Sequence, residues 1–153
     1  MAGFSQGGGD RDLFFGSGFA EQYHLRWFES HLPAFGVHRR SLRTEMPGFA
    51  LAGPRSRELL ARVCPDDVSD ATFPFLSFRA AEVAVVPARI GRISFTGELG
   101  YESWVPAEGA ARLCDALREA GAGRHRSSRA RYTTRPGSGC GGADRPGQPH
   151  APA

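Results

Sequence analysis

An acidic residue stands between two glycines in the stretch "SFTGELGYE", which covers residues 94–102. Gly97 and Gly100 suit a hairpin loop, because glycine adopts positive φ angles at little steric cost and lets another group approach the backbone. The carboxylate of Glu98 could accept two adjacent hydrogen bonds from a ligand with neighbouring N–H donors, and its charge would strengthen both bonds. Taken alone, the stretch favours a structural turn with a solvated glutamate, and ligand binding by Glu98 is the alternative.

Other residues capable of chemistry have simpler interpretations. The stretch "FGSGFAE" at 15–21 lacks the third glycine of a dinucleotide-binding loop, because Glu21 stands in its place, so it favours a strand-to-helix turn. His24 and His31 are seven residues apart, without the spacing of metal ligands, so we predict no metal site and expect both at the surface or its boundary. The three aspartates between 65 and 75 are interpreted as solvated turn residues.

The elements that must position these residues follow from the apolar pattern between 12 and 121. Apolar residues at helical spacing predict three helices, at 20–32, 54–63 and 107–121. Ser56 falls in the first turn of the second helix. Strands are predicted at 12–16, 37–45, 48–53 and 101–105, and on either side of Pro87 at 76–86 and 88–95.

This order of elements predicts an α+β domain. Strands that alternate with helices in this way indicate split β-α-β (ferredoxin-like) layers with a mainly antiparallel sheet. The length of 153 residues is sufficient for one domain with its own core. Residues 1–11 stand outside the apolar pattern, and we expect them to be disordered.

Residues 122–153 differ in kind from the rest. They contain no Leu, Ile, Val, Met, Phe or Trp and are rich in Arg, Gly and Pro, so we expect a disordered tail. The excess positive charge lies there: residues 1–120 carry 13 Arg against 15 acidic residues, and residues 121–153 carry 6 Arg against one. The tail is either a natural basic segment or the frameshifted reading of a GC-rich gene. The absence of lysine from the whole chain indicates a GC-rich gene, and the abrupt change in composition just after the predicted helix at 107–121 favours the frameshift.

The same charge distribution argues against the folded part as a nucleic-acid partner. No apolar run approaches the roughly 18 residues of a membrane span, and the N-terminus has no signal-peptide pattern. We therefore expect no membrane partner and a cytoplasmic location.

Three stretches together resemble the aminomethyltransferase folate-binding family, to which the glycine cleavage T-protein belongs. They are "SFTGELGYE", "GFALAGPRSRELLARV" at 48–63 and "GSGFAEQYHLRWFESHLP" at 16–33, the last being similar to the dimethylglycine and sarcosine dehydrogenase-like branch. The resemblance covers residues 12–121. It implies a domain that binds tetrahydrofolate and passes a one-carbon unit to it. Glu98 matches the pterin-binding glutamate of the family, and Gly97 and Tyr101 belong to the same motif.

The departures from the family pattern are equally specific. The resemblance implies a catalytic aspartate upstream of residue 12 and a second folate-binding arginine beyond residue 121, and neither is identified. It places FAD only in an upstream flavin domain of the dehydrogenases, and a barrel domain after the folate-binding part. We therefore expect 12–121 to be a partial, truncated domain with no catalytic residue, inactive alone. The alternative is a non-catalytic α+β module whose basic tail binds nucleic acid or another polyanion.

Overall fold

The computed structural model describes residues 4–5, 12–33, 35–94, 97–122 and 129–132, and the chain divides into two compact units, 1–46 and 47–153. The first unit holds a two-stranded antiparallel sheet of β1 (Phe4–Ser5) and β2 (Phe14–Phe15), a short 3-10 helix η1 (Gly18–Ala20), and helix α1 (Glu21–His31). Helix α1 agrees with the predicted helix at 20–32. The pairing of β1 with β2 departs from the expected disorder at Phe4 and Ser5, because main-chain hydrogen bonding requires no long apolar run.

The strand predicted at 37–45 is wrong. This segment is irregular and ends in a turn in which Glu45 and Met46 donate their N–H groups to the Leu42 carbonyl, at 3.0 and 2.7 Å. Charged side chains hold it instead of a sheet ladder. Arg43 pairs with Glu21 of α1 at 3.1 Å, and Arg40 pairs with Glu45 at 2.8 Å. The segment has few apolar side chains to bury on a sheet face, so its sequence gives little support to a strand.

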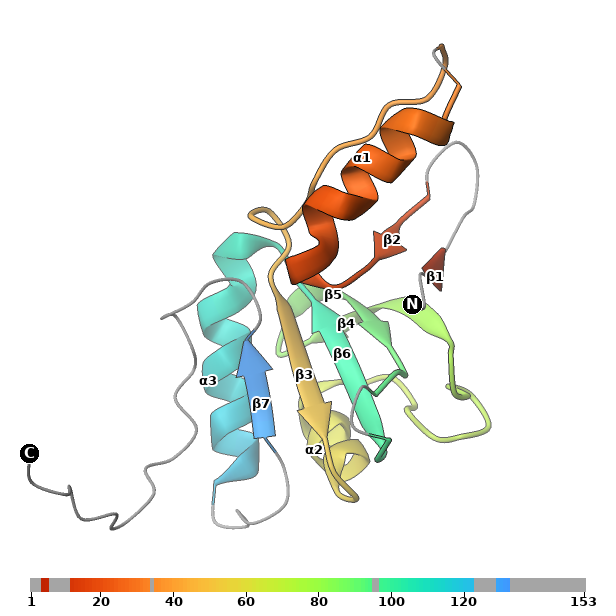
Figure 1. Ribbon diagram of the computed structural model, residues 1–153. Helices are drawn as coiled ribbons and strands as arrows, with labels where there is room; N and C mark the ends of the chain where they lie inside the picture. Colours follow the sequence, from red (N-terminus) through yellow and green to blue (C-terminus); the bar gives the residue numbers. More distant parts are fainter. Residues whose placement is uncertain (1–3, 6–11, 34, 95–96, 123–128, 133–153) are drawn as a thin grey trace, which may run out of the picture. The chain divides into compact units, whose positions relative to one another are not determined.

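The second unit contains an antiparallel sheet in the order β4-β5-β6-β3-β7 (Figure 1). Its strands are β3 (Gly48–Ala52), β4 (Phe78–Val83), β5 (Val86–Gly91), β6 (Gly100–Trp104) and β7 (Arg129–Tyr132). The helices are α2 (Ser56–Val63) and α3 (Ala110–Gly121), the latter preceded by the short η2 (Ala107–Gly109). The α+β class with an antiparallel sheet is therefore confirmed.

The split β-α-β arrangement is formed by elements other than the predicted ones. Strand β3 pairs antiparallel with both β6 and β7, so β6 and β7 run parallel on either side of it. Helix α3 connects these two parallel strands along the chain, and β3 separates them, which is a split β-α-β unit. It was expected among the first six predicted elements, which include the strand at 37–45 that does not form.

Strand β7 lies within the tail that we expected to be disordered. Its residues 129–132 pair with β3 in a register that joins Phe49 to Tyr132. The free edge of β3 offers unpaired backbone groups, and a polar segment can satisfy them without burying apolar side chains. The structure has a strand at these four residues, and the disorder of the tail stays a prediction. The rest of that prediction, at 123–128 and 133–153, lies outside the described residues.

One face of the sheet packs against α2 and α3. Alternate strand residues point into a single cluster with the apolar faces of both helices. Its fully buried members include Phe49, Leu60, Val83, Ile90, Tyr101 and Leu113. The helices at 54–63 and 107–121 were predicted from these apolar faces, and both are confirmed as α2 and α3, which start two and three residues later than predicted.

The turn between β4 and β5 was expected at Pro87 but lies at Ala84 and Val85. Val83 pairs with Val86, which leaves two residues for the turn, and both have positive φ angles, 54° and 61°. Two-residue hairpins of this kind normally use Asn or Gly. The sequence carried no such signal, and Pro87 is instead an exposed residue within β5.

Candidate functional site

The candidate site is the connection between β5 and β6. The two strands pair antiparallel, with Arg89 opposite Trp104, so the predicted hairpin is confirmed. Gly97 has a φ of 77°, and a Cβ at this position would meet no atom within 4 Å. Glycine is therefore needed at 97 for backbone conformation and not for lack of space. Glu98 follows it with an exposed side chain, so its carboxylate is accessible to a ligand.

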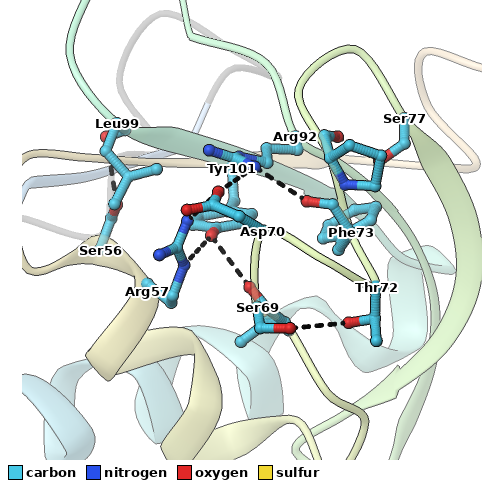
Figure 2. Close-up of polar contacts among 12 residues, drawn as sticks. Ser56, Arg57, Ser69, Asp70, Thr72, Phe73, Ser77, Arg92, Leu99 and Tyr101 are labelled. Atoms are coloured by element: carbon cyan, nitrogen blue, oxygen red, sulfur yellow. Dashed lines mark hydrogen bonds and ion pairs between the residues drawn. The ribbon is translucent and has the colours of Figure 1, made fainter.

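The Leu99 carbonyl ties this connection to the start of α2. It accepts a hydrogen bond from the Gly53 N–H at 2.9 Å and one from the Ser56 hydroxyl at 3.1 Å. Figure 2 shows Leu99 above Ser56, with the dashed contact between them. Ser56 is the first residue of α2, as its place in the first turn predicted, and its side chain is fully buried. The residue directly after Glu98 is therefore held by two donors.

Gly100 is the first residue of β6 and follows directly on the connection between β5 and β6, which we call the site loop. A Cβ placed on it would lie 2.7 Å from the Ser94 Cβ and 3.1 Å from the Ile93 carbonyl oxygen. Both are closer than a methyl group and its neighbour can come without displacement. The absence of a side chain at Gly100 therefore lets the two arms of the loop approach each other directly beside Glu98.

Tyr101 supports the loop from within the core. Its ring is fully buried and stacked on Phe73, with centroids 5.9 Å apart and planes 21° apart. The Arg57 Nε donates to its hydroxyl at 3.0 Å, and the hydroxyl donates to the Val68 carbonyl at 3.4 Å. These contacts surround the Tyr101 side chain with protein atoms, so Tyr101 contributes to the packing beneath the loop. Its assignment as a folate-binding residue stays a prediction.

An ion cluster that we did not predict lies beside Tyr101. Arg57 donates to the Asp70 carboxylate at 2.5 Å, and Arg92 pairs with the same carboxylate oxygen, as Figure 2 shows. Arg92 also donates to the Phe73 carbonyl at 3.1 Å. Asp70 lies in a turn with an exposed side chain, as interpreted, but its pairing with two arginines was not predicted. Its two partners stand 13 and 22 positions away in the sequence, and no local pattern joins them.

Glu102 lies three positions beyond the loop residue Leu99, on β6. It pairs with Ala50 of β3 on one side and Gly91 of β5 on the other. Its side chain is half-buried, and this burial raises the pKa of its carboxyl above the ordinary value. An ionised Glu102 therefore costs the folded domain stability.

The remaining sequence candidates have structural roles. His24 is buried, with its ring edge-on to Phe14 at 5.2 Å, so its predicted place at the surface or boundary is wrong. Phe14 comes from the short strand β2, and this contact was not visible in the spacing. Gly18, from the glycine pair at 16–18, begins the 3-10 helix η1. Within the described ranges, no group of three or more His, Cys, Asp or Glu side chains could hold a metal ion.

No helix among the described residues combines the length and apolar character needed to cross a membrane.

A family model described as the GCVT N-terminal domain matches residues 9–139. Human mitochondrial dimethylglycine dehydrogenase is 36% identical over 118 residues, which are 76% of this chain and 14% of that protein. An aminomethyltransferase from Chlorobaculum tepidum is 39% identical over 100 residues, 62% of this chain and 26% of that protein. The chain thus spans a minor part of the length of both relatives.

A solved structure shares the fold. The heterotetrameric sarcosine oxidase from Corynebacterium sp. U-96, in complex with pyrrole 2-carboxylate, aligns with a TM-score of 0.53 at 22% identity. The alignment covers 67% of this chain and 53% of that chain.

Proposed function

Because the chain belongs to the GCVT N-terminal domain family, we propose that it supplies a tetrahydrofolate-binding part of an enzyme that transfers one-carbon units. When bound, tetrahydrofolate accepts the one-carbon unit. Glu98 would hold the pterin ring through its carboxylate, and the backbone beside Gly97 would lie against the ring. Tyr101 would support the loop from below.

The accessibility of Glu98 is the observation that carries this proposal. Its exposed carboxylate stands on a loop whose next residue is held by two hydrogen bonds. A charged acceptor on a pre-ordered loop suits a ligand with adjacent N–H donors, because little conformational entropy is lost when the ligand binds. The residues present therefore fit the pterin ring. No residue of the described chain is assigned to FAD, which stays a prediction for a separate flavin domain.

The catalytic aspartate that the family resemblance implies for proton transfer is not identified among the residues assigned to the site. We therefore expect the 153-residue chain by itself to bind folate weakly and to capture formaldehyde with tetrahydrofolate at the uncatalysed rate. Folate-dependent capture well above that rate would contradict this part of the proposal. Cytoplasmic location and binding of a polyanion by the tail stay predictions.

Binding is tested by titrating the ¹⁵N-labelled chain with 5-formyltetrahydrofolate, a stable relative of the ligand, and following the amide signals of 97–99. We expect these signals to shift. Glu98→Gln should weaken binding about 10- to 100-fold, because it removes the charge from two hydrogen bonds.

Glu82→Gln is the matched control, since Glu82 is an exposed glutamate on β4, beside the other hairpin turn. Its binding should equal that of the unaltered chain. Equal affinities for Glu98→Gln and the unaltered chain, or no shift at 97–99 at millimolar ligand, would contradict the proposal.

A further inference from the structure

The Ser56 hydroxyl contacts a loop that is distant in sequence. Ser56 is the first residue of α2 and follows the N-cap residue Arg55, whose side chain makes no cap hydrogen bond. The Ser56 hydroxyl donates to the Leu99 carbonyl, 43 positions away in the sequence. It thus contributes to the loop after β5 and not to its own helix.

The surroundings of Ser56 make this contact hard to replace. Its side chain is fully buried, and its own N–H is bonded to the Gly53 carbonyl at 3.0 Å. A buried hydroxyl needs a hydrogen-bond partner, and water has no access to take over that role. The Gly53 N–H also reaches the Leu99 carbonyl, from a residue whose φ is 125°. Two donors therefore fix one carbonyl, and only the serine contributes through a side chain.

We propose that Ser56 is a positioning residue for Glu98: its buried hydroxyl fixes the Leu99 carbonyl and so holds the neighbouring carboxylate ready for the ligand. This inference rests on the proposed function of Glu98. The Leu99 carbonyl belongs to the Leu99–Gly100 peptide unit, which joins the Glu98–Leu99 unit at the Leu99 Cα. A fixed Leu99 carbonyl therefore limits the directions that the Glu98 backbone can take. Without the serine contact, binding would have to order the loop first, and affinity would fall accordingly.

The first measurement needs no ligand. The ¹⁵N order parameter of the Glu98 amide should lie near the ~0.85 of rigid backbone in the unaltered chain and fall toward ~0.6 in Ser56→Ala. The amides of α2 should keep their values. Ser69→Ala is the matched control, because Ser69 loses a hydroxyl that bonds Asp67 and Thr72 and has no part in holding Leu99. An unchanged order parameter at Glu98 in Ser56→Ala overturns the inference.

The second measurement is 5-formyltetrahydrofolate binding in a double-mutant cycle. Ser56→Ala should weaken binding by about 3- to 10-fold in the unaltered background and should have no effect in the Glu98→Gln background. Such non-additivity separates positioning through Glu98 from a general loss of structure. Equal fold-losses in both backgrounds overturn the inference.

The two proposals fail in different ways. If Glu98→Gln weakens binding and Ser56→Ala does not, the positioning role is wrong and the proposed function stands. If the unaltered chain shows no binding, the proposed function is wrong, and the order parameter still decides whether Ser56 holds the loop. Ser56→Cys, which nearly preserves side-chain volume and keeps a weak donor, should give an intermediate loss of order and serves if Ser56→Ala does not fold.

Discussion

Two connections flank strand β5, and they differ in strain and in chemistry. Ala84 and Val85 turn β4 onto β5 in two residues, both with positive φ angles and neither of them glycine. The connection from β5 to β6 uses glycine at its own positive φ angle, at Gly97, and presents the exposed Glu98 beside it. The connection between β4 and β5, which is strained, thus carries only apolar side chains. The connection between β5 and β6, which is relaxed, carries a carboxylate. In this chain backbone strain alone does not mark the candidate site.

Both connections are nevertheless fixed by the same helix. The Ala84 N–H donates to the Val63 carbonyl at the C-terminal end of α2, at 2.6 Å. The Leu99 carbonyl accepts from Ser56 at the N-terminal end of α2. Helix ends carry backbone groups without partners in the helix, so they are natural places to anchor a turn. The two connections thus share an anchoring helix although they differ in backbone strain and in the side chains that they present.

The largest effect should follow from crowding the site loop. Gly100→Ala would place a methyl group against the Ser94 Cβ and the Ile93 carbonyl, and neither can move without the backbone. We expect the free energy of unfolding to fall by about 1–3 kcal/mol, measured by urea denaturation.

Ser94→Gly in the same chain removes the closest contact and should recover part of that loss. Gly18→Ala is the matched control, since a Cβ there meets no atom within 4 Å. A neutral Gly100→Ala would mean that the site loop is no more tightly packed than the surface.

A smaller effect, of opposite sign, is expected at the strained turn. Val85→Gly should raise the free energy of unfolding by about 1 kcal/mol, because the strain of a left-handed residue exceeds the extra chain entropy of glycine. Thermal unfolding of the two chains measures the difference. Ala80→Gly, which removes a side chain from an exposed position within β4, should destabilise instead. If Val85→Gly also destabilises, the turn is not strained as described.

The smallest effect concerns the pH dependence contributed by Glu102. Burial raises the pKa of this carboxyl from its ordinary value of 4.5, so the folded state favours the neutral form. The stability cost of ionisation is absent below pH 4.5, grows as the pH rises and is complete above the raised pKa. Glu102→Gln should therefore stabilise the domain at neutral pH, with a gain that disappears in acid.

Urea denaturation at several pH values measures that gain. Glu82→Gln provides the comparison, because its exposed side chain stays in water when the chain folds. A gain for Glu102→Gln that is the same at acid and neutral pH would contradict the assignment of its cost to ionisation.

The parts of the fold that the sequence predicts are those with regular apolar periodicity. The periodic apolar residues correctly located two helices and two strands, namely α2, α3, β3 and β6. The predictions that failed concern segments whose structure is not determined by a local pattern of residues. The segment 37–45 is held by ion pairs to α1, and the turn at Ala84 and Val85 lacks the residues that normally mark a two-residue hairpin.

The candidate site likewise has a part that could be predicted from the sequence and a part that could not. The glycines around Glu98 predicted a hairpin, and the resemblance of the motif identified the residue that could bind a ligand. The contacts that support it could not be predicted, because Ser56, Arg57 and Asp70 reach their partners only through the tertiary fold. The sequence placed Ser56 only in the first turn of a helix, and nothing in its neighbours indicates a bond to Leu99.

The register of the sheet also sets an order of assembly. Val83 and Val86 meet across a two-residue turn, so β4 and β5 can pair while the chain around them is still unfolded. Strand β3 meets β6 only after a long loop closes, from Gly48 to Trp104, and the contact of Ser56 with Leu99 requires the same closure. Pairing of β4 with β5 alone would thus form the strained turn without organising Glu98. We therefore expect the loop that carries Glu98 to become ordered late in folding.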